Sequence, residues 1–517
     1  MNSAAPNAPR HLPLRLPRVC VAVTGSDAEE MIQKAEGLAR DNSFVEFRLD
    51  YLSKPALALP KVKRFVESHV GMVVIATCRR AASGGKFRGS IASQLDILAK
   101  AAASGCQLLD VEMQTAVKCR PDALQKLRSR AGLILSFHDF RGTKKLDETL
   151  EKMLAFPADF YKVVSTATTL SDNVEMIKFL AREGDRHSVV SMCMGEQGII
   201  SRVLGLRSGS VFTFAAAHAG EETGPGQIEA RTLRETWRID HIDASTKVYG
   251  VAGNPVRHSL SPLMHNIAFR RETVNGVFLP LQTTRLNDLL TLTREVPLQG
   301  LAITMPFKTE IIKHLAKTDA LSEKIGACNT VVRSQDGKLY GFNTDVAAVV
   351  RPLERRLPLR GAKVLVLGAG GAGRAAVFGL VEKGAEVFIW NRTADTAKKL
   401  ARQAKAKVIR REQIAKTNFD VIINTTPVGM KGVKPASLLE PKELNTRLVF
   451  DLVYNPIDTP LIRMAREKNL PVITGVEMFV HQGARQFEIW TGKPAPEEEM
   501  LRVVVHALRQ ESAKQQS

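Results

Sequence analysis

The stretch that decides the fold of this chain is Val364-Leu365-Val366-Leu367-Gly368-Ala369-Gly370-Gly371-Ala372-Gly373. Its first four residues form a wholly apolar run, which predicts a parallel strand buried on both faces. The glycines let the backbone turn sharply and approach a pyrophosphate, whose charge then lies at the N-terminus of the next helix. An alanine-rich helical stretch to Lys383 and a second strand, Glu386–Trp390, follow. This order favours a nucleotide-binding fold over a glycine-rich turn in some other α/β unit.

The residues after the second strand indicate which nucleotide binds. NAD-binding folds place an acidic residue there, which accepts hydrogen bonds from the ribose hydroxyls. This chain instead has Asn391, Arg392 and Thr393. A guanidinium beside two small polar groups suits a 2′-phosphate, and no carboxylate is present to repel one. The sequence therefore favours NADP(H), and the alternative is that Arg392 is a solvated surface charge.

The composition is that of a soluble globular protein, and 517 residues predict two or three domains. No apolar run approaches the length of a membrane span. Residues 1–18 contain several prolines and only basic charge, so they predict a disordered tail rather than a secretion signal. The six cysteines form no Cys-x-x-Cys pair. Cys20, Cys78 and Cys193 lie in or beside apolar runs, which predicts buried, reduced thiols in a cytoplasmic protein.

The net charge of +20 raises the question of nucleic acid binding. However, the charges are dispersed, aromatic residues are few, and the sequence contains no recognisable nucleic-acid module. Small anionic substrates and a phosphorylated cofactor would also need basic pockets. The interpretation is therefore small-molecule binding, with no nucleic acid and no membrane partner.

The N-terminal half, residues 19–243, has the rhythm of a (β/α)8 barrel. Short apolar runs alternate with helical stretches, which predicts eight strands, mostly about 20 to 35 residues apart. The alternative is an open doubly wound sheet, but the count of eight favours closure. The predicted strands are Val19–Val23, Phe44–Leu49, Val73–Thr77, Leu108–Glu112, Leu133–Phe137, Phe160–Val164, Val189–Met192 and Val211–Phe214.

Chemistry in such a barrel lies at the C-terminal ends of its strands. Several arginines there imply an anionic substrate. Lys162 has apolar and aromatic neighbours, which would desolvate the amine, lower its pKa and free it to attack a ketone. His138 follows the neighbouring strand and can transfer protons. Each residue alone would more often be structural, but together they indicate a Schiff-base site. The residues at these ends are Glu46, Arg48, Arg79, His138, Lys162, Arg202 and Gln227.

The motifs around these residues resemble type I 3-dehydroquinate dehydratase. They are Glu46-Phe47-Arg48-Leu49-Asp50, Ser136-Phe137-His138-Asp139, Tyr161-Lys162-Val163, Gly198-Ile199-Ile200-Ser201-Arg202 and Pro225-Gly226-Gln227. The resemblance implies that Lys162 forms an imine with the substrate ketone and that His138 is the general acid and base. It also implies that substrate is bound by Glu46, Arg48, Arg79, Arg202, Thr223 and Gln227.

The chain departs from that family at Ser83, where a glutamate usually pairs with the histidine. A serine cannot supply the negative charge that would raise the pKa of His138. Three alternatives follow: Ser83 orients the histidine alone, another carboxylate substitutes, or this half is slow.

A new domain begins at Lys247, after a short polar joint. Ser259 and Ser261 lie on a turn and can bind a carboxylate, or Ser261 can cap the next helix. Lys308 and Asp345 come from separate loops and could polarise and protonate an alkoxide during hydride transfer, or form a surface ion pair. Further polar residues, including Thr425, follow apolar strands where open α/β sheets bind ligands.

These motifs, in this order, resemble shikimate dehydrogenase over nearly all of residues 247–508. The resemblance implies that Lys308 and Asp345 are the catalytic pair. It implies a substrate-binding lobe at 247–346, an NADP-binding Rossmann lobe at 347–490 and a C-terminal helix at 491–517 that returns to the substrate lobe. The implied substrate ligands are Ser259, Ser261, Thr304, Asn329, Tyr454 and Gln482. The implied cofactor ligands are Gly368, Ala369, Gly370, Gly371, Ala372, Gly373, Asn391, Arg392, Thr393, Thr425, Leu452 and Gly475.

The whole chain is thus predicted to be an α/β protein in which a (β/α)8 barrel is fused to a two-lobed dehydrogenase. The barrel would convert 3-dehydroquinate to 3-dehydroshikimate, and the second half would reduce that ketone to shikimate with NADPH. No metal is implied. Two alternatives remain: an NAD-linked catabolic quinate/shikimate dehydrogenase, and a non-enzymatic sensor of these metabolites.

Overall fold

The computed structural model describes residues 15–433 and 437–516. Residues 1–14 of the predicted N-terminal tail therefore lie outside the described residues. The chain divides into two compact units, Met1–Thr246 with Asn287–Val296, and Lys247–Leu286 with Pro297–Ser517. None of the helices in the described ranges is both long and apolar enough to cross a membrane.

The first unit contains one sheet of eight parallel strands in the order β7-β6-β5-β4-β3-β2-β1-β8. The Val211 N–H donates to the Val189 carbonyl (2.9 Å), which links the start of β7 to the residues before β8. The sheet therefore closes into the predicted barrel rather than an open sheet. The strands are β1 (Val19–Val23), β2 (Phe44–Arg48), β3 (Val73–Thr77), β4 (Leu108–Glu112), β5 (Gly132–His138), β6 (Phe160–Thr166), β7 (Val189–Met194) and β8 (Thr213–Ala216).

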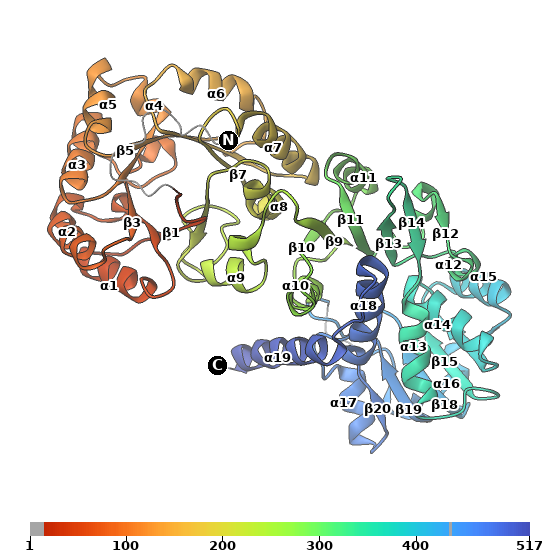
Figure 1. The fold of residues 1–517 in the computed structure, drawn as a ribbon. Helices are drawn as coiled ribbons and strands as arrows, with labels where there is room; N and C mark the ends of the chain where they lie inside the picture. Colours follow the sequence, from red (N-terminus) through yellow and green to blue (C-terminus); the bar gives the residue numbers. More distant parts are fainter. Residues whose placement is uncertain (1–14, 434–436, 517) are drawn as a thin grey trace. The chain divides into compact units, whose positions relative to one another are not determined.

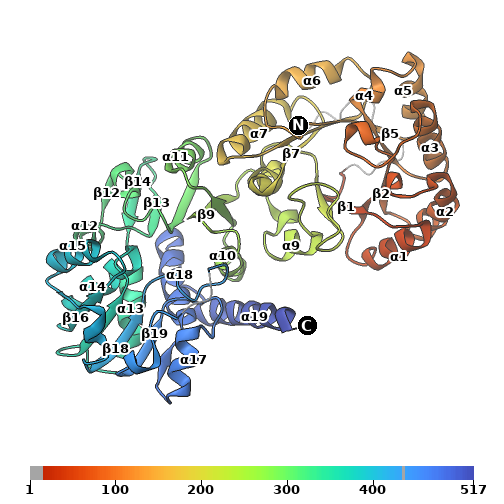
Figure 2. The ribbon, with the colours of Figure 1, turned by 180° about the vertical axis from the view of Figure 1, so that it is seen from behind.

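Helices lie around the outside of these strands (Figures 1 and 2). Inside the barrel, one cluster of buried side chains includes Phe44, Ile75, Leu108, Ile134 and Phe212. Burial of these apolar side chains supplies the main favourable term for closing the sheet. The helices are α1 (Ala28–Leu38), α2 (Leu59–Ser68), α3 (Ile91–Ala103), α4 (Met113–Ala116), α5 (Pro121–Arg128), α6 (Leu146–Leu154), α7 (Leu170–Glu183), α8 (Ile199–Leu204) and α9 (Ala230–Glu235).

The second unit begins with a mixed sheet in the order β10-β9-β11-β13-β14-β12. Its central strands β11 and β13 pair antiparallel, whereas β9 pairs parallel with both β10 and β11. The strands are β9 (Lys247–Gly253), β10 (Gly276–Gln282), β11 (Leu298–Ile303), β12 (Lys317–Thr318), β13 (Thr330–Arg333) and β14 (Leu339–Phe342). The helices of this stretch are α10 (Ser261–Arg271), α11 (Leu286–Glu295), α12 (Ala320–Ile325) and α13 (Asp345–Glu354). All of α11 except Leu286 is assigned to the first unit.

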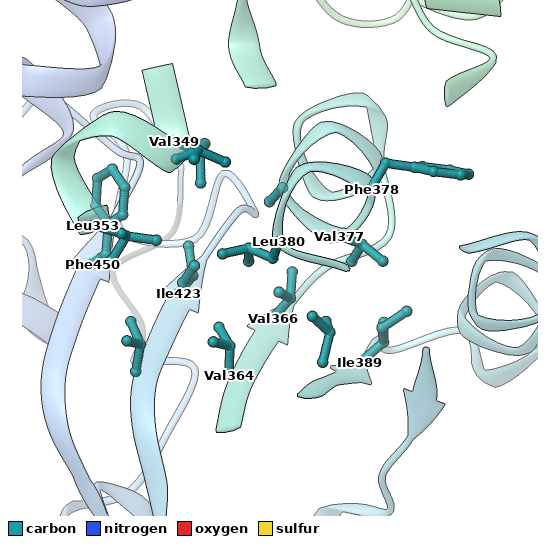
Figure 3. Close-up of a cluster of buried hydrophobic side chains, with 14 of the residues drawn as sticks. Val349, Leu353, Val364, Val366, Val377, Phe378, Leu380, Ile389, Ile423 and Phe450 are labelled. Atoms are coloured by element: carbon teal, nitrogen blue, oxygen red, sulfur yellow. The ribbon is translucent and has the colours of Figure 1, made fainter. Parts of the chain in front are cut away.

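The glycine-rich stretch lies in a second, parallel sheet with the order β17-β16-β15-β18-β19-β20. Val364 and Val366 of its central strand, β15, are buried with Leu380 and Ile423 (Figure 3). The strands are β15 (Lys363–Leu367), β16 (Glu386–Trp390), β17 (Lys407–Val408), β18 (Phe419–Asn424), β19 (Thr446–Asp451) and β20 (Val472–Ile473). The helices are α14 (Gly371–Glu382), α15 (Ala394–Ala404), α16 (Arg411–Ile414) and α17 (Pro460–Glu467).

Two C-terminal helices, α18 (Gly475–Thr491) and α19 (Glu497–Gln516), complete the second unit (Figure 1). The side chains of Phe479, Val480 and Phe487 on α18 are buried in the core of the substrate lobe. The chain thus returns to that lobe within α18, before residue 490, because an apolar face of this helix packs there.

Candidate active sites

Lys162 occupies the interior of the barrel on β6 and is only 4% exposed. Its Nζ lies 3.1 Å from Oδ2 of Asp110 and 4.0 Å from Oε1 of Glu46. The same nitrogen lies 3.7 Å from the centre of the Phe214 ring. Two carboxylates and an aromatic face therefore surround the amine, a setting suited to an ammonium or iminium charge.

Asp110 connects the polar side chains of this site, and it is not among the residues predicted from the sequence. Its carboxylate accepts hydrogen bonds from Ser136 (2.6 Å), Arg79 (3.1 Å) and Lys162 (3.1 Å). Burial alone would raise the pKa of this carboxyl, but the charges of Lys162 and Arg79 hold it below its usual value. The sequence does contain one indication of its importance. Asp110 interrupts the apolar run of β4, and the interior of a strand rarely holds an acidic residue without a partner.

His138 is the last residue of β5. Desolvation and the positive charges of Arg79 and Lys162 hold the pKa of His138 well below its ordinary value, while the charge of Asp110 raises it. The imidazole is therefore neutral at pH 7 and can accept a proton.

Ser83, which replaces the family's glutamate, donates to Oε1 of Gln114 over 3.4 Å. None of the described contacts joins Ser83 to His138. Asp110 supplies the negative charge that acts on His138.

The predicted arginines of the barrel are all buried. Both carboxylate oxygens of Asp50 accept hydrogen bonds from Arg48 (2.8 and 2.9 Å), so this guanidinium is already paired. Among the described contacts, Nε of Arg79 and Nε of Arg202 are buried without a partner. Burial lowers the pKa of Arg202 to about 10. Unpaired, desolvated donors of this kind are suited to binding an anionic ligand.

Thr223 and Gln227 follow β8 and bond to one another. Oε1 of Gln227 accepts from the Thr223 backbone (2.7 Å) and from its hydroxyl (3.1 Å). None of the described contacts joins this pair to Lys162 or His138. The loop is tied to the barrel nearby, where the Gly195 N–H donates to the Pro225 carbonyl (2.9 Å).

In the second unit, both predicted catalytic residues and all six predicted substrate ligands of that half line one cavity of about 840 Å³. Lys308 and Asp345 form an ion pair across it, with Nζ 2.5 Å from Oδ2. The other oxygen of Asp345 accepts from the Asn329 amide (2.7 Å). The predicted pair is thus an ion pair inside a pocket, not on the surface. The residues concerned are Ser259, Ser261, Thr304, Lys308, Asn329, Asp345, Tyr454 and Gln482.

Asn329 is held rigidly by its neighbours. Its side-chain oxygen accepts from the Thr344 N–H (2.8 Å), and its own carbonyl accepts from Nε2 of Gln486 (3.1 Å). Gln486 is a further cavity residue that sequence reasoning missed, because only the fold brings α18 beside β13.

The two serines and Tyr454 form a second polar group in the cavity. The Ser259 hydroxyl donates to Ser261 over 3.1 Å. Burial raises the pKa of Tyr454, and its hydrogen bonds to the Ser259 side chain and the Leu260 backbone oppose that rise. These hydroxyls are positioned to bind a polar ligand without a full charge.

The glycine-rich loop fits a bound dinucleotide. Gly368 has φ +113° and its missing Cβ would lie 2.6 Å from Oγ1 of Thr425, so the turn requires glycine. At Gly370 a Cβ would meet nothing within 4 Å, which leaves open space beside the N-terminus of α14. A Cβ on Gly371 would lie 2.9 Å from the Lys308 side chain, so the loop directly adjoins the predicted catalytic pair.

The predicted cofactor ligands fall into three groups. Those that line the cavity are Gly368, Ala369, Gly370, Gly371, Ala372, Asn391, Thr425 and Leu452. Arg392 and Thr393 are exposed beyond its lining. Gly373 and Gly475 serve close packing, because their missing Cβ atoms would lie 2.5 Å from the Gly368 carbonyl and 2.4 Å from the Val453 carbonyl, respectively.

Comparison with known proteins gives four family profiles along the chain. "Type I 3-dehydroquinase" matches residues 19–244, and "Shikimate dehydrogenase substrate binding domain" matches residues 251–331. "Shikimate / quinate 5-dehydrogenase" matches residues 353–458, and "Shikimate 5′-dehydrogenase C-terminal domain" matches residues 475–505. The bifunctional 3-dehydroquinate dehydratase/shikimate dehydrogenase of Arabidopsis thaliana, a chloroplastic protein, is 32% identical, covering 93% of this chain and 83% of that protein. The chain belongs to this bifunctional family.

The shikimate dehydrogenase half of this bifunctional protein also resembles enzymes that consist of that half alone. The NADP(+) shikimate dehydrogenase of Pyrococcus furiosus is 40% identical, covering 52% of this chain and 99% of that protein. A crystal structure of Thermus thermophilus shikimate 5-dehydrogenase with NADP(H) and shikimate is 37% identical, with a TM-score of 0.47, and covers 51% of this chain and 100% of that one. The predicted fusion of a dehydratase and a dehydrogenase is confirmed.

Proposed function

We propose that this bifunctional enzyme dehydrates 3-dehydroquinate at Lys162 and then reduces the product, 3-dehydroshikimate, with NADPH at the Lys308–Asp345 pair. The observation that carries the proposal is that each half has its own lysine–carboxylate pair, buried in the barrel and partly buried in the second unit. Lys162 and Asp110 lie in the barrel, and Lys308 and Asp345 lie beside the glycine-rich loop.

In the barrel, the neutral form of the Lys162 amine attacks the substrate ketone, and loss of water gives an iminium. The neutral His138 imidazole removes the α-proton and returns a proton to the departing hydroxyl, so one water leaves overall. Hydrolysis of the iminium then releases 3-dehydroshikimate and restores the lysine. The unpaired Nε atoms of Arg79 and Arg202 support binding of the substrate carboxylate.

In the second unit, the substrate carboxylate is bound by Ser259 and Ser261, and its ketone faces Lys308. NADPH, when bound along the glycine-rich loop, supplies the hydride. Lys308 donates a proton to the developing alkoxide, and Asp345 keeps the ammonium in position. Asn329 fixes Asp345 from the opposite side.

Preference for NADPH over NADH is proposed from the exposed side chain of Arg392, which follows β16 and can reach a 2′-phosphate. Substitution Arg392→Ala would therefore raise KM for NADPH far more than KM for NADH. Arg447→Ala, at the opposite end of the sheet, is the matched control.

The experiment that tests the two-step function follows NADPH absorbance with only 3-dehydroquinate supplied. We expect the absorbance to fall with the natural chain and to stay constant with Lys162→Ala, which should still reduce added 3-dehydroshikimate. Lys63→Ala, an exposed lysine of the barrel, is the control. A natural chain that reduces only added 3-dehydroshikimate would refute the dehydratase assignment. No reduction of either compound would refute the reductase assignment and favour a metabolite sensor.

A further inference from the structure

Glu511 on α19 binds two residues of the lobe that contains the parallel sheet β15–β20, here called the nucleotide lobe. Its Oε1 lies 2.9 Å from Nζ of Lys431, and its Oε2 accepts a hydrogen bond from Nδ2 of Asn455 (3.0 Å). The Lys431 N–H in turn donates to the Asn455 carbonyl (2.9 Å). One carboxylate thus holds together the loops that follow β18 and β19.

The helix that carries Glu511 belongs to the other lobe. Met500, Val504 and Leu508 on α19 are buried in the same apolar cluster as Met264 and Phe269 of α10. Because α19 is anchored there, Glu511 forms a connection between the substrate lobe and the nucleotide lobe.

The loops that Glu511 holds form part of the reductase cavity. Lys431, Asn455 and Tyr454 all line it, and the Tyr454 hydroxyl bonds to Ser259 from the substrate lobe. Two connections therefore cross between the lobes here, one through Tyr454 and one through Glu511. Asn455 directly follows Tyr454, so the hydrogen bond between Glu511 and Asn455 holds the chain next to the tyrosine.

The ion pair with Lys431 is not the important part of this contact. Both side chains are more than one-third exposed, and ion pairs of that kind contribute little. The hydrogen bond to Asn455 sets the geometry, because it fixes the loop whose neighbouring residue faces the substrate.

We propose that Glu511 is a positioning residue for substrate binding in the reductase half, acting through Asn455 on Tyr454. The inference rests on the proposed function, because it takes Tyr454 to be a residue that binds the substrate of the reductase. No role for a residue this far along the C-terminal helix is evident from the motifs of the sequence, since α19 carries none of them.

The test compares Glu511→Ala, Glu511→Gln and the control Glu498→Ala, an exposed glutamate on the same helix. We expect Glu511→Ala to raise KM for 3-dehydroshikimate roughly three- to tenfold, with kcat changed less than about twofold. Glu511→Gln should stay close to the natural protein, because its amide oxygen still accepts from Asn455. Calorimetry with shikimate should show the same order of affinities, and dehydratase activity should be equal in all variants.

Three results separate the possible failures. If Glu511→Ala matches Glu498→Ala in KM and in shikimate affinity, the inference is overturned. If Glu511→Ala lowers kcat and thermal stability without a specific rise in KM, Glu511 is only structural and the inference is again overturned. If the natural chain fails to reduce 3-dehydroshikimate, the proposed function is overturned, and shikimate calorimetry still decides the role of Glu511.

Discussion

Among individual residues, Asp110 is bonded to more of the barrel's polar groups than either Lys162 or His138. It accepts from Ser136, Arg79 and Lys162 while buried, so its removal leaves two desolvated cations without their shared partner. Breaking such a buried pair costs about 3–5 kcal/mol. We therefore expect Asp110→Asn to lower dehydratase kcat/KM at least about tenfold without changing the reductase rate.

The same substitution should also change the pH profile in a defined direction. His138 must be neutral to act as a base, and the Asp110 charge raises the pKa of that imidazole. Its loss lowers this pKa, so the acid limb of dehydratase kcat/KM should move to lower pH. Asp122→Asn, an exposed aspartate, serves as the control. An acid limb that moves upward would show that Asp110 does not act on His138 through its charge.

At the scale of structural elements, the glycines of the glycine-rich loop have two different roles: one is required by the backbone conformation, and another leaves space for a ligand. Gly368 has a positive φ and no room for a Cβ, whereas Gly370 has open space. We expect Gly368→Ala to lower the free energy of unfolding by about 1–3 kcal/mol. Gly370→Ala should keep its stability and weaken NADPH binding, because the added methyl group occupies the cofactor's side of the loop. Thermal unfolding and NADPH titration of both variants check this, and a stable Gly368→Ala variant would contradict it.

Asp451, at the end of β19, gives the second unit a predictable pH dependence. Burial raises the pKa of this carboxyl to about 6, and hydrogen bonds from Thr459, Val453 and Asn424 only partly offset the rise. The folded form therefore keeps its proton between about pH 4 and 6, where the unfolded chain ionises. Stability should fall by about 2–3 kcal/mol as pH rises through this window. Urea titrations at several pH values should show that the free energy of unfolding of Asp451→Asn decreases less over this pH range than that of the natural chain. An unaltered slope would mean that Asp451 is already ionised.

The sequence predicted these elements well where a local pattern was sufficient. Continuous apolar runs located the barrel strands to within about two residues, and the glycine spacing located the nucleotide loop. The last barrel strand shows the limit: Val211 and Phe212 were expected inside it, but it begins at Thr213. Both lie in an apolar run that precedes the pairing with β1, and hydrophobicity alone does not mark where pairing starts.

Contacts between distant parts of the chain could not be predicted in this way. Asp110 reaches Lys162 across 52 positions, and Glu511 reaches Lys431 across 80. The role of each depends on which strands and helices become neighbours, and no single segment carries that information. By contrast, the predicted substrate ligands, such as Ser259 and Tyr454, could be listed from the sequence because each lies within a recognisable local motif, and the structure brings them to one cavity.

For the whole molecule, the two predicted lysine–carboxylate pairs lie in separate units. Every described contact of Lys162 comes from the first unit, and those of Lys308 and Asp345 come from the second. A substitution that inactivates one half should therefore leave the activity of the other half unchanged. We expect an equal mixture of Lys162→Ala and Lys308→Ala chains to form shikimate from 3-dehydroquinate after a lag, at about half the rate of the natural chain. Each variant alone should form none, because one step is missing. Mixtures that stay inactive, while each variant retains its own half-reaction, would show that 3-dehydroshikimate does not pass from one chain to another. Formation of shikimate by either variant alone would instead refute the assignment of its lysine.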